Sequence, residues 1–375
     1  MPSTNKTQHL HLNQYIGTDI QEMVDVNNDN DKIDKAFLAV SGALDYLVER
    51  GCGASQGHII NGNFDIWQRG TSQTTTGYGS DDRWNNTHAG ATKTHSRQAF
   101  TVGQSDVPGN PTYFSTTVVN SVAGASNRCQ KAQNIEDVRS CAGQIITVSF
   151  WAKADAPRYL ALSFYQSFGA GGSSSEAIPG QKVELTTAWN KYNLTFNIPS
   201  IFGKTIGTNS MLQCVFWFDA GSNFNAITSS LGHQSGTFDI AQVKLEEGSV
   251  ATPFAPRHMA EELALCQRYY EKSYSIDVIP GTVSTSGASV LLPIIINRLA
   301  WGEPFKVPKR TNPTITIYSH ATGASARISL YNNNEDVPIF GMSGSHRNLY
   351  LFIQASTGNF VQTAYYAHWV ADSEL

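Results

Sequence analysis

The chain has 375 residues, which is enough for two or three domains with cores of their own. Its residues are 41% hydrophobic, 11% aromatic and only 15% charged, which excludes an intrinsically disordered chain and is typical of a β-rich protein with an extracellular type of surface. The formal net charge of −4 argues against nucleic acid as a partner.

No hydrophobic run approaches the ~20 residues that cross a bilayer, so we expect no membrane insertion. Residues 1–20 are polar and show no signal-peptide pattern. The five cysteines match neither a zinc motif nor a disulfide framework, and we expect mostly free thiols. They are Cys52, Cys129, Cys141, Cys214 and Cys266, of which Cys129 and Cys141 would be able to pair if they flanked a hairpin.

Residues 1–57 are predicted to form an extended arm followed by a helix and a glycine-rich linker. Apolar residues recur at the 4–3 spacing of a coiled-coil seam, at Ile33, Phe37, Val40, Leu44 and Leu47. Because this pattern covers only about two heptads, two interpretations stay open. The helix is either a single amphipathic helix on a neighbouring domain or part of a three-helix bundle that sets a trimer.

Residues 58–256 predict an antiparallel β-sandwich, because apolar and polar residues alternate in short runs separated by turn residues. The clearest runs are Ile145–Trp151, Tyr159–Tyr165, Tyr192–Ile198 and Gln213–Phe218. Trp67 and Trp84, near the start of this region, are expected to anchor its core.

Residues 257–275 predict a linker helix, running from Arg257 to about Tyr274 after Pro256. Residues 276–375 predict a further β domain. Its strand-like runs are Val290–Ile296, Thr314–Tyr318, Arg327–Tyr331, Leu349–Gln354 and Ala364–Ala371.

The sandwich region opens with Asn61–Gly70 and Ser80–Trp84, and it closes with Phe238–Gly248. This frame resembles the carbohydrate-binding-module-like jelly-roll domain of many bacteriophage tail-fibre and receptor-binding proteins. The run Glu262–Tyr274 and the ending Ala371–Leu375 are also similar to such fibres, so the resemblance extends over nearly the whole chain. It implies a mainly β fold with an N-terminal arm and helix, a central antiparallel β-sandwich (jelly roll), a linker helix and a C-terminal β domain facing the host.

The resemblance implies a non-enzymatic structural protein of a phage tail, made in the bacterial cytoplasm and located in the virion. The N-terminal segments Leu12–Asp19 and Asp29–Asp34 are similar to those of fibres attached to tails and baseplates. The expected partners are therefore two further chains in a homotrimer, other tail or baseplate proteins at the N-terminus, and a host cell-surface glycan. Two alternatives stay open: a tailspike enzyme that degrades capsule or lipopolysaccharide, and a purely structural head or baseplate fibre.

Two groups of residues are candidates for glycan binding, since sugars stack on aromatic rings and bond to planar polar groups. If alternate residues of the predicted strands point into the core, Trp151, Tyr165 and Trp217 share the outer face of the sandwich. His346 and Arg347 belong to a polar loop that we expect at the tip of the C-terminal domain. The alternative is that both sheet faces are covered and that the loop is an ordinary turn.

A structural calcium ion is the one cofactor that the resemblance implies. Its expected oxygen donors are Asn63, Asp65 and Asp239. The sequence offers no catalytic pattern. Gly53–Gly57 matches the nucleophile-elbow string, but it lies in a linker rather than at a strand-to-helix turn.

Overall fold

The computed structural model describes residues 5–6, 13–14, 29–37, 57–291, 293–295, 298–330, 334–340, 343–355 and 364–375. The chain divides into two compact units. The first comprises Met1–Ser55 with Thr252–Ala255, and the second comprises Gln56–Ala251 with Pro256–Leu375. In the described part of the chain, no helix combines the length and the apolar character that a membrane crossing requires.

In the first unit, β1 (Asn5–Lys6) pairs antiparallel with β2 (Asn13–Gln14). A helix covers residues 29–37, as the heptad pattern predicts at its start. Ile33 and Phe37 lie on this helix with exposed side chains. The other predicted seam residues, Val40, Leu44 and Leu47, fall outside the described residues, so the choice between a lone helix and a trimeric bundle stays a prediction.

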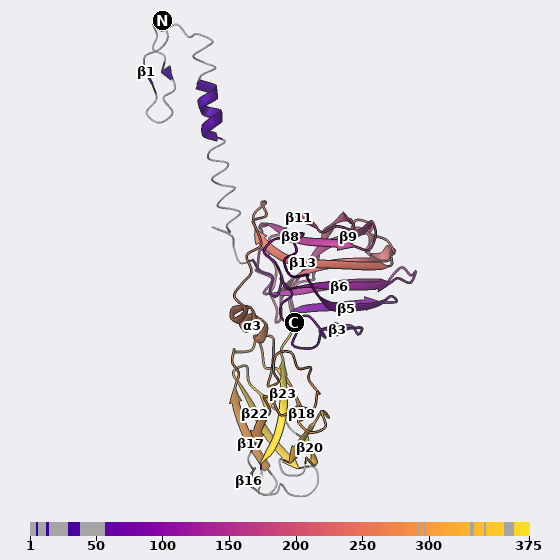
Figure 1. Cartoon of the computed structure of the whole chain (residues 1–375), viewed down its shortest axis with the longest axis vertical. Coiled ribbons are helices and arrows are strands. Elements are labelled where there is room, and N and C mark those ends of the chain that lie inside the picture. The colour runs from indigo at the N-terminus through magenta and orange to yellow at the C-terminus, as the bar shows by residue number, and fades with distance from the viewer. Residues whose placement is uncertain are drawn as a thin grey trace. The chain divides into compact units, whose positions relative to one another are not determined.

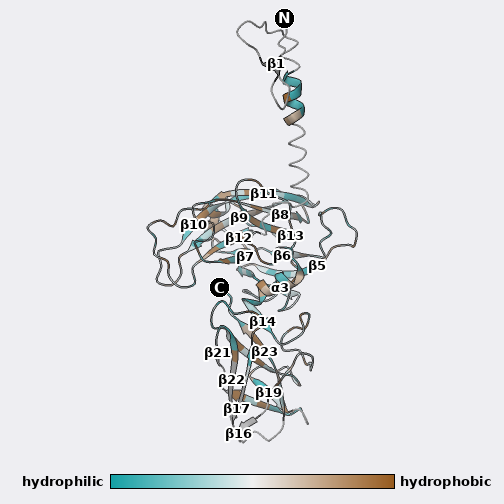
Figure 2. Ribbon diagram, turned by 90° about the vertical axis from the view of Figure 1, so that its left-hand side faces the viewer, coloured by the Kyte–Doolittle hydropathy of each residue, from teal (hydrophilic) through white to brown (hydrophobic). Residues whose placement is uncertain are grey.

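The second unit begins with a sandwich of two antiparallel sheets, and consecutive strands cross repeatedly from one sheet to the other, as in a jelly roll. In sheet order, as Figure 1 shows, the six-stranded sheet contains β11 (Asn190–Asn197), β8 (Ile145–Ala154), β13 (Gly236–Glu247), β6 (Tyr113–Asn120), β5 (Thr92–Ala99) and β3 (Ser72–Gln73). The five-stranded sheet contains β10 (Glu176–Leu185), β9 (Arg158–Ser167), β12 (Met211–Ala220), β7 (Arg128–Glu136) and β4 (Trp84–Ala89), and its first four strands are labelled in Figure 2. All four strands predicted from alternation are present.

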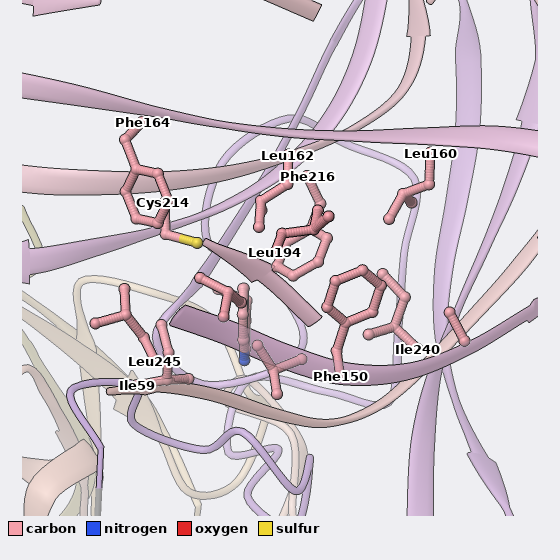
Figure 3. Close-up of a cluster of buried hydrophobic side chains, with 14 of the residues drawn as sticks. Ile59, Phe150, Leu160, Leu162, Phe164, Leu194, Cys214, Phe216, Ile240 and Leu245 are labelled. Carbon is pink, nitrogen blue, oxygen red and sulfur yellow. The ribbon is translucent and has the colours of Figure 1, made fainter. Parts of the chain in front are cut away.

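The sandwich core lies between the two sheets, where alternate side chains of facing strands meet (Figure 3). On β9, Leu160, Leu162 and Phe164 are fully buried, which confirms the predicted direction of that strand. Phe150 of β8 meets Phe216 of β12 edge to face, with 5.2 Å between ring centres. Such aromatic pairs between sheets add to the burial of apolar area that holds the layers together.

The predicted core anchors Trp67 and Trp84 are both buried, and the ring of Trp84 stacks on that of Phe64. The thiols at Cys129, Cys141, Cys214 and Cys266 are buried and free, so the expectation of free cysteines is confirmed for all except Cys52, which lies outside the described residues.

A short helical insertion follows β12: the 3₁₀ helix η1 (Ser222–Phe224) and α2 (Asn225–Thr228). After β13, the predicted linker helix is shorter than expected. It forms α3 (Met259–Gln267), and the chain then turns into β14 (Tyr270–Lys272). The helix ends because Tyr270–Lys272 pairs with residues 370–372 of the last strand, and that tertiary pairing overrides the local helical pattern.

The C-terminal domain is a β domain, as predicted, and four of its strand pairings are antiparallel pairs with the last strand. Its strands are β15 (Ser289–Leu291), β16 (Pro293–Ile295), β17 (Arg298–Pro304), β18 (Thr314–Ser319), β19 (Arg327–Leu330), β20 (Asp336–Phe340), β21 (Ser343–Gly344), β22 (Asn348–Ala355) and β23 (Tyr365–Asp372). Ile317, Ile328 and Trp369 lie in its buried core.

Candidate functional site

The three aromatic residues predicted to share an outer face do not do so. Trp151 lies on β8 of the six-stranded sheet, whereas Tyr165 on β9 and Trp217 on β12 belong to the five-stranded sheet. The alternation of each strand is as predicted, but alternation cannot tell which sheet a strand joins. The expected common platform is therefore wrong.

Trp217 points away from the core, as predicted, but it is only 2% exposed. Its ring packs against Phe224, 5.2 Å away, and against the side chains of Ala161 and Leu231. Its indole N–H donates to Ser163 Oγ at 2.8 Å. The insertion that carries η1 and α2 thus covers this part of the sheet, and a sugar cannot reach the Trp217 ring without displacing it.

His346 and Arg347 are exposed, but they do not lie at the far tip of the C-terminal domain. Their carbonyl oxygens accept hydrogen bonds from Lys309 N and Phe305 N. The side chain of Lys309 in turn donates to Gln267 O, at the end of α3. The turn therefore lies at the α3 end of the domain, which corrects its predicted position.

The three expected calcium donors are not brought together as one ligand set. Asn63 Nδ2 donates to Asp65 Oδ2 at 2.8 Å. Asp239 instead accepts from Thr116 Oγ1 at 2.6 Å and lies 3.7 Å from Lys153 Nζ. Asp239 therefore has its partners on β6 and β8, apart from the Asn63–Asp65 pair, and the calcium site stays a prediction.

A pocket of about 620 Å³ lies where the sandwich meets the C-terminal domain, within the second unit. Its wall combines tyrosine rings with hydroxyl, carboxylate and guanidinium groups. The polar and aromatic residues in it are Arg69, Tyr78, Tyr270, Thr314, Thr316, Tyr318, Asp372 and Glu374. This volume is in the usual range for a site that holds a small ligand.

Three strands of the C-terminal domain place one side of the pocket by their register. Tyr270 of β14 and Thr314 of β18 both pair with Asp372 of β23, on its two sides. On β18, Ile315 and Ile317 point into the domain core, so Thr314, Thr316 and Tyr318 point outward. Alternation along β18 thus produces a row of two threonines and one tyrosine in the pocket wall.

Arg69 supplies the charge on the sandwich side. Its guanidinium carbon lies 3.7 Å from the centre of the Tyr270 ring, and its Nη2 is 3.3 Å from Asp372 Oδ2 and 3.2 Å from Glu374 Oε1. Burial opposes the charge, but the carboxylates of Glu374, Asp372 and Asp82 together raise the pKa of Arg69 above its usual value. Arg69 Nη1 is buried without a hydrogen bond, although it lies 3.9 Å from Asp82 Oδ1.

The opening motif of the sandwich holds Arg69 in place. The Asn61 side chain donates to Ile66 O and Asp82 O, and Asp82 accepts from Gln68 N at 2.9 Å. The residue after Asn61 has to be a glycine, because a Cβ at Gly62 would collide with the carbonyl oxygen of Val243. The motif that suggested the resemblance therefore forms a rigid loop that presents Arg69 to the C-terminal domain.

The residues after β23 fold back onto the same loop. Glu374 forms buried ion pairs with Arg83 and Arg69, and Arg83 lies 3.4 Å from the ring centre of Tyr269. Tyr78 Oη donates to Leu375 O at 3.2 Å. The two domains are thus joined by charged groups that are paired rather than by apolar packing alone.

Burial keeps the pocket hydroxyls neutral at physiological pH. It raises the pKa of Tyr78 to about 12 and also raises the pKa values of Tyr270 and Tyr318. Neutral phenols can both donate and accept hydrogen bonds. The arrangement is chemically suited to bind a polyhydroxylated ligand through ring stacking and hydroxyl contacts.

Sequence reasoning did not find this pocket. Its residues come from positions 69–79, 270, 279–280, 314–318 and 370–374, and no spacing relates them. One signal was available: the motif Asn61–Gly70 carries an arginine, Arg69, next to its last residue, and the ending Ala371–Leu375 carries two acids. Complementary charge in these two motifs would have indicated a contact between them.

Neither a protein-family model nor a curated protein matches this sequence. Among solved structures, the chain is similar to a CBM4 structure at 19% identity, over 50% of this chain and 98% of that chain, with a TM-score of 0.30. It is also similar to the family 11 carbohydrate-binding module from Clostridium thermocellum in complex with a β-1,3-1,4-mixed-linked tetrasaccharide, at 10% identity, over 47% and 95% of the chains, with a TM-score of 0.29. The enzymatically active domain of bacteriophage CBA120 tailspike protein 4 aligns at 14% identity, over 52% of this chain but 22% of that chain, with a TM-score of 0.32.

Proposed function

We propose that this chain is a non-enzymatic receptor-binding or fibre protein of a bacteriophage tail, and that it holds a neutral sugar of a host-surface glycan in the pocket around Arg69. The observation that carries the proposal is the composition of the pocket wall. Three tyrosine rings, two threonine hydroxyls and the Asp372 carboxylate line a space of about 620 Å³. These are the groups that stack on sugar rings and accept or donate hydrogen bonds to hydroxyls.

The charges around the pocket favour a neutral sugar over an acidic one. Among the residues that line the pocket, the Arg69 guanidinium faces the carboxylates of Asp372 and Glu374, so two acids surround one base. A phosphate or carboxylate on the ligand would have to compete with these acids for Arg69. The hydroxyls of a neutral hexose meet no such repulsion.

The same two carboxylates are poorly arranged for glycoside hydrolysis. Asp372 and Glu374 both bond to one nitrogen of Arg69. A glycosidase needs two carboxyl groups on opposite sides of the bond that breaks, one of them protonated. This supports a binding role, and sugar release from purified host polysaccharide would instead favour the tailspike alternative.

The proposed protein acts as a homotrimer in the virion, attached to other tail or baseplate proteins through its N-terminal arm. Single sugar sites are weak, so three linked copies would raise the overall affinity without any new contact. The exposed Ile33 and Phe37 on the N-terminal helix support an association of this kind. The mass of the purified oligomer tests it: three times the 40.9 kDa chain mass is expected, and a monomer would exclude it.

The pocket is tested by glycan-array binding of the full chain, followed by calorimetry with the best neutral ligand. Tyr318→Ala should weaken binding at least about tenfold, because it removes one stacking ring. Tyr159→Ala is the matched control, since Tyr159 is an exposed tyrosine on β9 of the sandwich. Tyr318→Ala with unchanged affinity, or a loss of binding in Trp151→Ala or Tyr165→Ala instead, would contradict the pocket assignment.

A further inference from the structure

One cluster of possible metal ligands includes His58, which lies just before the opening motif Asn61–Gly70 that carries Arg69. His58, Cys141 and Glu247 each offer one ligand atom, and the three atoms lie within 4.8 Å of one another. His58 Nε2 and Glu247 Oε1 are 3.8 Å apart. We propose that these three side chains bind one Zn²⁺ ion, which ties the beginning and the end of the sandwich to the turn between β7 and β8.

The backbone holds the three residues in place independently of any metal. His58 N donates to Leu245 O at 2.9 Å, which fixes His58 beside the end of β13. Glu247 is the last residue of β13 and pairs with Ile146 of β8. Cys141 lies in a turn that is closed by a 3.0 Å hydrogen bond from Gln144 N to the carbonyl oxygen of Cys141. Backbone hydrogen bonds therefore bring the three positions together, and the side chains complete the approach.

The exposure of the three side chains suits a metal site at the edge of a domain. Cys141 is 4% exposed and points into the sandwich, whereas the side chain of Glu247 is 56% exposed. An ion would enter from the Glu247 side and reach the thiol behind it. Because the Glu247 side chain is free to rotate in solvent, it can move to the ~3.3–3.8 Å separations that tetrahedral zinc ligands require.

The ligand types select the metal. Calcium and magnesium prefer oxygen ligands only, so a thiol and an imidazole exclude them. Zinc takes sulfur, nitrogen and carboxylate oxygen together, and three protein ligands leave one position for water. On binding, the bond from Cys141 sulfur to zinc forms as the S–H bond breaks, and the proton passes to solvent. Burial raises the pKa of Cys141 to about 12, so the metal has to displace this proton.

The test strips the full chain of metal with a chelator, reloads it with excess Zn²⁺ and removes the unbound ions by dialysis. We expect one Zn²⁺ per chain by elemental analysis, a higher melting temperature with zinc than without, and a thiolate-to-metal charge-transfer band when Co²⁺ replaces zinc. The band reports a thiolate ligand, and its loss in Cys141→Ser assigns it to the Cys141 sulfur. Histidines elsewhere in the sequence, such as His9 and His11, can bind cobalt without producing it.

Three variants locate the site. Cys141→Ser should abolish the charge-transfer band, and His58→Gln and Glu247→Gln should each weaken zinc binding. Removing a hydrogen-bonding partner of a zinc ligand costs ~10–100-fold in affinity, so removing a ligand should cost at least as much. His233→Gln is the matched control, because His233 Nδ1 lies 3.1 Å from Asp219 Oδ1 and, within the described residues, belongs to no cluster with a third ligand.

The proposal is overturned if the wild-type chain binds less than one zinc ion, if cobalt gives no thiolate band, or if Cys141→Ser binds zinc as tightly as the wild type. Circular dichroism checks that Cys141→Ser folds. Should it not fold, Glu247→Gln decides the outcome, because Glu247 is exposed and its replacement leaves the core intact. Unchanged zinc affinity in Glu247→Gln would then refute the three-ligand site.

Discussion

At the scale of single residues, strand alternation correctly gives the direction of a side chain but not what lies above it. Trp217 points out of the core, yet the ring of Phe224 and the hydroxyl of Ser163 enclose it. Ser163 and Ala161 are likewise fully buried on the outer side of β9. An outward direction is therefore not the same as exposure to solvent.

Buried thiols are a second property of single residues, and they make stability depend on pH. Burial raises the pKa of Cys214 well above its usual value, so the folded chain keeps this proton at a pH where the unfolded chain loses it. The folded state then binds more protons than the unfolded state. The resulting stability is complete below the unfolded pKa of ~8.5 and is lost progressively as the pH rises above it.

We expect Cys214→Ala to make the loss of unfolding free energy with pH shallower by about 1.4 kcal/mol per pH unit between about pH 9 and about pH 10. Urea unfolding of both proteins under reducing conditions measures the two slopes. The small cavity in the variant lowers its stability at every pH but leaves the slope to report the thiol. Equal slopes would contradict the assignment.

At the scale of elements, two local patterns give way to tertiary contacts. Residues 270–272 continue the helical pattern of α3, but they pair with β23 and form β14. The insertion η1–α2 has only one buried residue of its own, Thr228, and it is stabilised by resting on β10, β9 and β12. Short elements of this kind are set by what they pack against rather than by their own sequence.

Phe224→Ala is expected to loosen the insertion from the sheet. It should lower the free energy of unfolding by about 1–3 kcal/mol, which is less than the loss from truncating a fully buried phenylalanine. It should also shift tryptophan fluorescence to longer wavelength, because water then reaches Trp217. Urea unfolding and emission spectra check both effects. Phe202→Ala is the control, because Phe202 is 95% exposed and its removal should change neither.

At the scale of the whole second unit, buried ion pairs connect the sandwich to the C-terminal domain. Arg69 and Arg83, both in the opening part of the sandwich, reach across to Glu374 after β23. A buried charge that loses its partner costs ~3–5 kcal/mol, far more than a surface ion pair contributes. The two domains should therefore unfold together.

Glu374→Gln is expected to uncouple them, because it keeps the shape of the side chain and leaves two buried guanidinium groups without their shared carboxylate. Calorimetry should show one transition for the wild type and two for the variant, with a loss of about 3–5 kcal/mol. Glu261→Gln, an exposed change on α3, is the control. Separate transitions in the wild type, or a single unchanged one in Glu374→Gln, would contradict the coupling.

The sequence by itself determined four strands of the sandwich, the β character of the C-terminal domain, the core anchors Trp67 and Trp84, and the free thiols of the four cysteines that the structure describes. These follow from periodicity, side-chain size and spacing, which act over a few residues. Only the tertiary structure decided that Trp151 and Trp217 lie in different sheets, that an insertion covers Trp217, and that Arg69 meets Tyr270 and Asp372. The tertiary structure also brings together His58, Cys141 and Glu247. Sheet order and domain docking place side chains that are up to about 300 positions apart in the sequence, and no local sequence pattern specifies such contacts.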